Sequence, residues 1–156
     1  MEMITDTRCE REQAFAEALK ADGLRMTHQR LEVIRELAGA TQHPGADELF
    51  RAVRQRVPTI SRDTVYRTLS TLESRGLIER ITTPGAARFD PDTSVHNHFL
   101  CVRCGRILDL GTDESCRLEM PAELAGVGEI TSVRLEIKGV CAACAAARAD
   151  ADPASR

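Results

Sequence analysis

The stretch SRDTVYRTLSTLESRGLIERI, residues 61–81, decides the fold of the first half of the chain. Ser61 is a favourable helix N-cap. Apolar residues then repeat at helical spacing, at Val65, Leu69 and Leu72. Gly76 predicts the end of this helix, because glycine accepts the backbone conformation that closes helices. Residues 77–81 then predict a strand, so the stretch predicts a helix followed closely by a strand.

Upstream of this stretch, apolar periodicity and capping residues predict three more helices. They cover residues 11–21, the segment between the N-cap Thr27 and the stop at Gly39, and residues 46–56. Downstream, Pro84-Gly85 separates residues 77–81 from residues 86–90, which predicts a two-stranded hairpin. Helices that end in a small hairpin form a winged helix-turn-helix, the fold that we expect for this half.

The second half of the chain, after Asp92, has a different pattern. It predicts strands over 98–102 and 106–110 around a Cys-x-x-Cys-Gly turn, a helix over 112–120, a strand over 130–138 and a tail that is helical from Ala145. The expected fold class is α+β. We expect a winged-helix DNA-binding domain over residues 1–90, a hinge over 91–95 and a small α/β metal-binding domain over 96–156.

Composition places the chain among soluble globular proteins. Of its 156 residues, 42% are hydrophobic and 29% are charged. The net charge of −3 gives no overall preference for nucleic acid, but residues 51–80 hold seven arginines against three acidic residues. Such a local basic patch can bind phosphates. Because we find neither a signal peptide nor a membrane-length apolar run, we expect a cytoplasmic protein with reduced thiols.

Two cysteine pairs, Cys101-x-x-Cys104 and Cys141-x-x-Cys144, are the strongest chemical signal. Two residues between cysteines let both thiolates point at one ion, and two such pairs complete the tetrahedron of a structural zinc site. The 36 residues between the pairs exceed the spacing of a zinc ribbon, so the ion would join distant segments. A redox pair is the alternative.

Five further residues offer imidazole or carboxylate groups without a thiolate: His43, Asp90, His96, His98 and Asp109. His96 and His98 are two apart in a segment that should be extended, so both side chains leave the same face. Such a donor set suits iron, manganese or zinc rather than copper(I). Spacing alone leaves open that His96 and His98 are ordinary polar residues at the protein surface and that His43-Pro44 forms a turn.

The helix that begins after Ser61 presents candidate DNA contacts near its N-terminal half. They are Ser61, Arg62, Thr64, Tyr66 and Arg67. In helix-turn-helix proteins this half enters the major groove, where arginine pairs with guanine and threonine or tyrosine touches a thymine methyl group. The alternative is a solvated charged helix.

Taken together, these residues resemble the ferric uptake regulator (Fur) superfamily. The matching segments cover most of the chain: Gly23-Leu24-Arg25-Met26-Thr27-x-x-Arg30, His43-Pro44, Asp63-Thr64-Val65-Tyr66-Arg67-Thr68-Leu69, Gly76-Leu77-Ile78, Arg88-Phe89-Asp90 and His96-x-His98-x-x-Cys101-x-x-Cys104-Gly105. The resemblance implies a homodimer on palindromic double-stranded DNA, with the C-terminal domain as the dimerisation domain. Arg25 resembles a basic residue that approaches the minor groove.

The resemblance also implies a regulatory metal ion between the domains, in addition to the structural Zn(II). Its ligand positions hold His43, Asp90, His96, His98 and Asp109. Fe(II) or Mn(II) at this site would fix the angle between the two reading helices and so raise DNA affinity. The positions of a third metal site found in many iron-uptake members look like Val95 and Val133, so we expect no third site.

Aspartates at both acidic positions, Asp90 and Asp109, resemble the peroxide-sensing (PerR-type) branch, because iron-uptake members typically have glutamates there. In that branch Fe(II) reacts with hydrogen peroxide, and oxygen is added to a ligand histidine. By position the oxidation-sensitive residues are His43 and His96. Manganese supports repression and resists this chemistry. The resemblance therefore implies a repressor that releases its promoter on oxidation.

Three other functions remain open from the sequence. Within the same class, the chain could be an iron- or zinc-responsive repressor without peroxide chemistry. Two histidines and two aspartates also suit a non-haem oxygenase, but we find no substrate pocket or nucleophile and do not expect an enzyme. The third is a zinc-stabilised interaction module that binds no DNA. Cys9 and Cys116 fit none of these motifs, and we expect free thiols.

Overall fold

The computed structural model describes residues 3–111, 121–124, 126–130, 133 and 135–149. The chain folds into two compact units. The helical unit comprises residues 1–82 and 86–93, and the cysteine unit comprises residues 83–85 and 94–156. Within the described ranges, no helix combines the length and the apolar character needed to cross a membrane.

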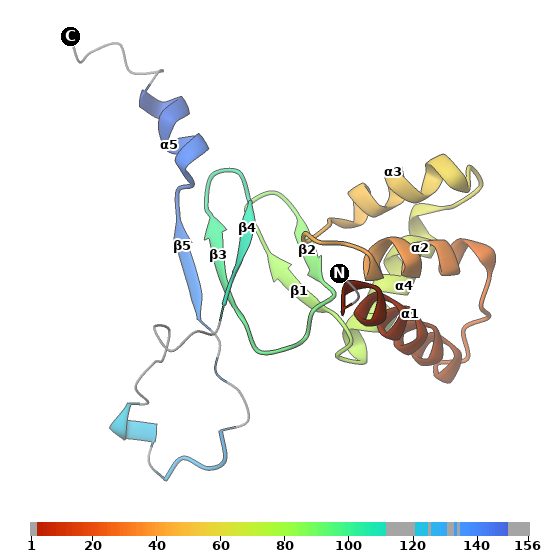
Figure 1. Cartoon of the computed structure of the whole chain (residues 1–156), viewed down its shortest axis with the longest axis horizontal. Coiled ribbons are helices and arrows are strands. Elements are labelled where there is room, and N and C mark those ends of the chain that lie inside the picture. Colours follow the sequence, from red (N-terminus) through yellow and green to blue (C-terminus); the bar gives the residue numbers. More distant parts are fainter. Residues whose placement is uncertain (1–2, 112–120, 125, 131–132, 134, 150–156) are drawn as a thin grey trace. The chain divides into compact units, whose positions relative to one another are not determined.

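Four helices and a hairpin make up the helical unit (Figure 1). They are α1 (Met3–Ala21), α2 (His28–Ala38), α3 (Ala46–Arg56), α4 (Arg62–Ser74), β1 (Glu79–Thr82) and β2 (Ala87–Asp90). The Ser61 hydroxyl accepts a hydrogen bond from the Thr64 N–H at the start of α4. Just past its end, Gly76 has a φ of 67°, a conformation that glycine adopts without strain. The winged helix expected from the sequence is confirmed.

A single hydrophobic core holds this unit together. Its fully buried apolar members come from all four helices: Phe15, Leu19, Val33, Ile34, Leu37, Leu49, Val53, Val65, Leu69 and Leu72. Ile78, just before β1, and Phe89 of β2 join the hairpin to the same core. The antiparallel pairing of β1 with β2 places Glu79 opposite Asp90. The end of β2, which carries Asp90, is therefore anchored to the packed helices.

The cysteine unit is built on a three-stranded sheet. Its elements are β3 (Asn97–Cys101), β4 (Ile107–Leu110), the short 3-10 helix η2 (Ala122–Leu124), β5 (Glu136–Gly139) and α5 (Ala142–Ala149). The strand order is β4-β3-β5. β3 pairs antiparallel with β4 and parallel with β5. The central strand β3 thus receives one neighbour from the adjacent sequence and one from a distant segment.

Three boundaries differ from the sequence-based expectation by three residues or more. Helix α1 begins at Met3 and not at residue 11, because polar pairs such as Arg8–Glu12 extend it where apolar periodicity is weak. Within the strand expected over 130–138, the described residues form β5 from Glu136, which pairs with the five-residue strand β3. The tail helix begins at Ala142 rather than Ala145. The helix expected over 112–120 lies outside the described residues.

Candidate metal centres and reading helix

Parallel pairing of β3 with β5 brings the four cysteines of the two pairs together. The register places Cys101 beside Gly139, two residues before Cys141. Cys104 lies in the turn after β3, and Cys144 lies in the first turn of α5. The four Sγ atoms of these cysteines all lie within 4.8 Å of one another. The chain therefore returns to the sheet at β5 in a register that completes the cluster.

The geometry and electrostatics of this cluster suit zinc. The sulfurs of Cys104 and Cys141 are 3.8 Å apart, and a tetrahedral zinc with bonds of about 2.3 Å separates its sulfurs by about 3.8 Å. Backbone N–H groups of Cys104 and Cys141 lower the pKa of the Cys101 thiol to about 6. Hydrogen bonds with Cys141 and Cys104 raise the pKa of Cys144 to about 12. A divalent cation would displace the proton that the Cys144 thiol otherwise keeps in this cluster.

His43 and Asp90 form a buried pair in the helical unit. His43 follows α2 in the loop that leads to α3, and Asp90 is the last residue of β2. The distance from His43 Nε2 to Asp90 Oδ2 is 3.3 Å, and the side chains are only 6% and 4% exposed. The backbone N–H of Asp92 donates to Asp90 Oδ1 at 2.8 Å. This bond orients the carboxylate so that Oδ2 faces the imidazole.

His96, His98 and Asp109 form a second group in the cysteine unit. The antiparallel register pairs His98 directly with Asp109, and His98 Nε2 lies 3.4 Å from Asp109 Oδ1. His96 Nε2 lies 3.8 Å from the same oxygen. His96 Nδ1 is 2.9 Å from the carbonyl oxygen of Ser94. A proton on Nδ1 would satisfy that carbonyl and leave the Nε2 lone pair for a metal ion.

Both groups offer hard or borderline donors and contain no thiolate. Imidazole nitrogens with carboxylate oxygens fit iron, manganese or zinc, whereas the cysteine cluster selects softer coordination. Within the cysteine unit, the ligand atoms of His96, His98 and Asp109 all lie within 4.8 Å of one another. The structure thus separates two kinds of donor chemistry.

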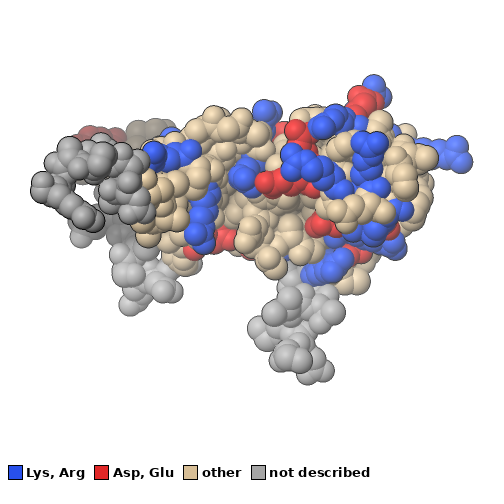
Figure 2. Space-filling view, turned by 90° about the horizontal axis from the view of Figure 1, so that it is seen from above, with Lys and Arg blue, Asp and Glu red and all other residues tan. Residues whose placement is uncertain are grey.

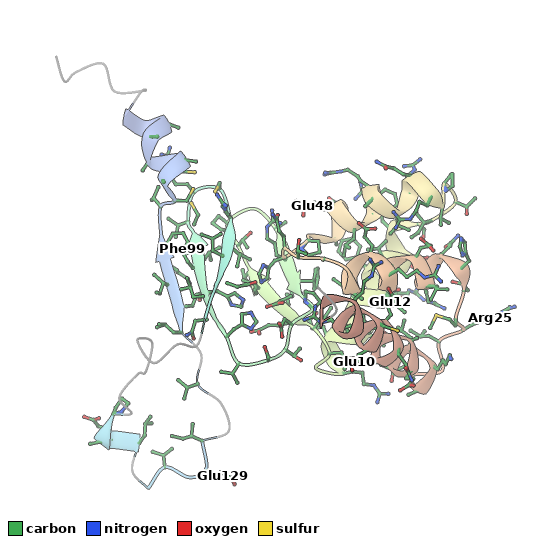
Figure 3. All side chains as sticks on the ribbon, viewed as in Figure 1. Glu10, Glu12, Arg25, Glu48, Phe99 and Glu129 are labelled. Atoms are coloured by element: carbon green, nitrogen blue, oxygen red, sulfur yellow. The ribbon has the colours of Figure 1, made fainter. Side chains whose placement is uncertain are left out.

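The exposed face of α4 carries the candidate DNA contacts, and basic side chains are spread over the helical unit among acidic ones (Figure 2). Tyr66 is 53% exposed. Arg67 is also exposed and pairs with Asp63 at 2.9 Å. The hydroxyls of Ser61 and Thr64 are 2.9 Å apart. Arg25, in the loop before α2, extends away from the ribbon into solvent (Figure 3).

Arg62 differs from the other candidate DNA contacts because α3 already holds it. Its guanidinium forms an ion pair with Asp47 and lies 4.6 Å from the centre of the Phe50 ring. Stacking on an aromatic face and pairing with a carboxylate both favour this position. Sequence periodicity does not reveal such a contact, since the partners are 15 and 12 positions away along the chain.

Sequence reasoning also missed the role of Arg88 and Glu48. Glu48 accepts the backbone N–H of Gly45 at 2.9 Å, and Arg88 pairs with the same carboxylate. Burial would raise the pKa of Glu48, but the Gly45 N–H and the Arg88 charge outweigh it and hold the pKa below its ordinary value. Two sequence signals pointed to Arg88: its place two residues before Asp90 in a predicted strand, and its place in the matching segment Arg88-Phe89-Asp90.

The fold and these donor sets agree with a family assignment from the sequence. The model of the ferric uptake regulator family matches residues 21–138. This match covers α2 to α4, the hairpin and the sheet of the cysteine unit. The chain belongs to the ferric uptake regulator family.

Two curated relatives are named peroxide-responsive repressor PerR. The protein from Staphylococcus epidermidis is 35% identical over 136 residues, which cover 86% of this chain and 90% of that protein. The protein from Staphylococcus aureus (strain Mu50) is 34% identical over 128 residues, which cover 81% of this chain and 86% of that protein. These relatives match along most of their own length.

Solved structures of ferric uptake regulators share the fold. The Vibrio cholerae regulator is 28% identical with a TM-score of 0.61, covering 80% of this chain and 98% of that chain. The Helicobacter pylori regulator, described as having three functional metal binding sites, is 23% identical with a TM-score of 0.68. That match covers 86% of this chain and 93% of that chain.

Proposed function

We propose that this protein is a dimeric, metal-dependent transcriptional repressor that senses hydrogen peroxide. The observation that carries the proposal is the separation of donor chemistry: four clustered thiols, apart from histidine–aspartate groups within each unit. Zinc at the thiols is structural. Fe(II) or Mn(II) at His43, Asp90, His96, His98 and Asp109 is regulatory. The family resemblance assigns these five positions to one regulatory ion, and an ion bound by all five would couple the helical unit to the cysteine unit.

DNA binding is assigned to α4 and to the loop before α2. A winged helix inserts such a helix into the major groove, and Tyr66 and Arg67 are exposed on it. Arg25 would lie toward the minor groove and the phosphates. Ser61 and Thr64, at the start of α4, would contact the DNA backbone or the bases. Arg62 would have to leave Asp47 to reach DNA, so we assign it the smallest role.

A second copy of the chain is expected to cover the apolar surface of the cysteine unit. Its described residues include several large apolar side chains that are more than two-fifths exposed: Val127, Ile130, Val133, Ile137 and Val140. Exposed apolar groups of this kind mark association surfaces. A two-fold dimer would present two reading helices, and a palindromic operator matches that symmetry.

The regulatory step follows from the residues that bind the ion. With metal bound, the two units are fixed in the conformation that favours DNA, and the population shifts toward it. Fe(II) held by these residues would supply the redox chemistry that activates hydrogen peroxide, and it would not be consumed in the net reaction. At the histidine, the net change inserts one peroxide oxygen into a ring C–H bond and releases water. We expect this at His43 or His96, after which the ligand set binds metal poorly and DNA is released.

Mass spectrometry tests the peroxide reaction. The zinc-replete protein is loaded with Fe(II) or with Mn(II), treated with hydrogen peroxide and digested. We expect one added oxygen on the peptides of His43 or His96 after Fe(II) loading and none after Mn(II) loading. If Fe(II)-loaded protein gains no oxygen on His43, His96 or His98, the chain is a metal-responsive repressor without peroxide sensing.

A gel-shift assay on an inverted repeat tests the metal switch itself. We expect Mn(II) to raise affinity by about 5- to 150-fold, and His96→Ala with His98→Ala to abolish the increase. Binding should weaken steeply with salt, as phosphate contacts require. Equal affinity for filled, stripped and doubly substituted protein would contradict a metal-dependent repressor.

A further inference from the structure

The loop that carries His43 is tied to strand β2 along its backbone. The N–H of Phe89 donates to the carbonyl oxygen of Pro44 at 3.0 Å. Gly45 and Arg88 form an isolated antiparallel bridge next to it. The loop therefore runs antiparallel to β2 over one bridge, and this pairing restrains the backbone next to His43.

Arg88 adds a side-chain contact to the same loop. Its Nη1 donates to the carbonyl oxygen of His43 at 2.8 Å. The same guanidinium bonds both carboxylate oxygens of Glu48, at 3.1 Å and 3.3 Å. Glu48 lies near the start of α3, as Figure 3 shows. It also accepts the Gly45 N–H, so one carboxylate holds both the loop and the arginine.

The geometry of β2 explains why Arg88 and Asp90 both contact His43. Side chains two apart in a strand leave the same face, so Arg88 and Asp90 project from one face of β2. Asp90 faces the His43 imidazole, at 3.3 Å from Nε2, while Arg88 grips the His43 carbonyl. One face of β2 thus contacts His43 twice: Asp90 contacts the His43 side chain, and Arg88 contacts the His43 main chain.

We propose that Arg88, held by Glu48, is a positioning residue that sets the separation of His43 and Asp90 for metal binding. The inference rests on the function proposed above, since it concerns two of the regulatory ligands. Arg88 itself supplies no ligand atom. It restricts the backbone of His43, so the imidazole and carboxylate are preorganised before the ion arrives. Groups that orient ligands in this way typically change metal affinity by about 10- to 100-fold when removed.

Manganese titration of the full-length, zinc-replete protein tests this role. The electron paramagnetic resonance signal of free Mn(II) reports the dissociation constant. We expect Arg88→Ala to weaken Mn(II) binding by about 10- to 100-fold, and Arg88→Lys, which keeps the charge without the fork, to weaken it less. Glu48→Gln should weaken it by at least about threefold, because the arginine loses its charged anchor. Zinc content and helical circular dichroism confirm that each variant is folded.

A double-mutant cycle separates positioning from general stability. If Arg88 acts through His43, then Arg88→Ala in a His43→Ala background should change Mn(II) affinity by less than about twofold. Arg35→Ala is the matched control, because Arg35 pairs with Glu32 in the same unit. We expect it to leave Mn(II) affinity unchanged.

The outcomes distinguish this inference from the proposed function. A wild-type protein that binds no Mn(II) beyond its zinc overturns both. Normal wild-type binding, with Arg88→Ala and Glu48→Gln within about twofold of it, overturns the positioning role alone. If Arg88→Ala fails to fold, Arg88→Lys and Glu48→Gln decide the question. A lower unfolding temperature with unchanged affinity would make Arg88 merely structural.

Discussion

Glu32 shows how a single charged residue is kept inside the helical unit. It is 8% exposed on α2. Arg56 of α3 donates to its carboxylate at 2.9 Å, and Arg35 donates at 2.8 Å. These hydrogen bonds hold the pKa of Glu32 below its ordinary value of 4.5, and the bond from Arg56 lowers the pKa more than the bond from Arg35 does. The pair with Arg56 joins α2 to α3, between which the loop with His43 runs, whereas the pair with Arg35 lies within α2.

The lowered pKa of Glu32 predicts a specific acid sensitivity. Because the pKa is lower in the folded chain, the pairing stabilises the protein above the unfolded-state pKa and is lost as pH falls below it. At neutral pH we expect Glu32→Gln to lower the free energy of unfolding by about 1 kcal/mol, since the arginines are half-exposed. Urea unfolding followed by circular dichroism should show this difference shrinking as the pH falls from the unfolded-state pKa through the lower folded-state pKa. A difference that does not vary with pH would contradict the assignment.

At the scale of elements, the parallel pairing of β3 with β5 determines where the second cysteine pair lies. The N–H of Val102 donates to the Gly139 carbonyl at 2.8 Å, which continues the pairing into the first cysteine turn. An ideal Cβ on Gly139 would lie 2.9 Å from a ring atom of Phe99, whose side chain stands on β3 in Figure 3. The absence of a side chain at Gly139 therefore permits the close approach of the two strands.

Gly139→Ala should weaken zinc retention. The added methyl group forces the Phe99 ring to move, and such overpacking costs about 1–3 kcal/mol. The measurement is the chelator concentration at which half of the zinc is released. Lys138→Ala, at the exposed neighbouring position, is the control and should behave as wild type. Phe99→Leu should restore part of the retention to Gly139→Ala. Equal midpoints for the two alanine variants would count against this packing argument.

At the scale of the whole molecule, the two units have different sources of stability. The helical unit has its own apolar core. Among the described residues, that core contains none of the four clustered cysteines. In the cysteine unit, Leu100, Cys101 and Cys141 are the buried apolar residues among those described. A structural zinc ion contributes on the order of 10 kcal/mol to the folding of a small metal domain. The cysteine unit therefore depends on its metal far more than the helical unit does.

Removal of zinc should therefore unfold one unit selectively. With a strong chelator, we expect the sheet of the cysteine unit and the dimer to be lost while α1 to α4 remain. Circular dichroism would retain most of its helical signal, and sedimentation would show monomers. Added Mn(II) should restore neither, because the thiol cluster needs the softer ion. A dimer that persists after complete zinc removal would contradict this division of stability.

The sequence by itself predicted the elements whose signals are local. The caps Thr27 and Ser61, the apolar periodicity of α2 to α4 and the turn at Pro84-Gly85 predicted the winged helix, which the structure confirms. The pairs Cys101-x-x-Cys104 and Cys141-x-x-Cys144 predicted a thiol cluster, because the spacing of two is itself geometric. Element ends were less predictable, since the length of β5 depends on its partner β3.

Only the tertiary structure decided the contacts between residues distant in sequence. The parallel register that places Gly139 beside Cys101, the Arg62 contact with Asp47 and Phe50, and the Arg88 contacts with Glu48 and His43 all join separate elements. The physical reason is that periodicity reports which face of an element is buried, but not which partner covers it. Arginine side chains reach several partners, so their contacts are set by packing and not by local sequence.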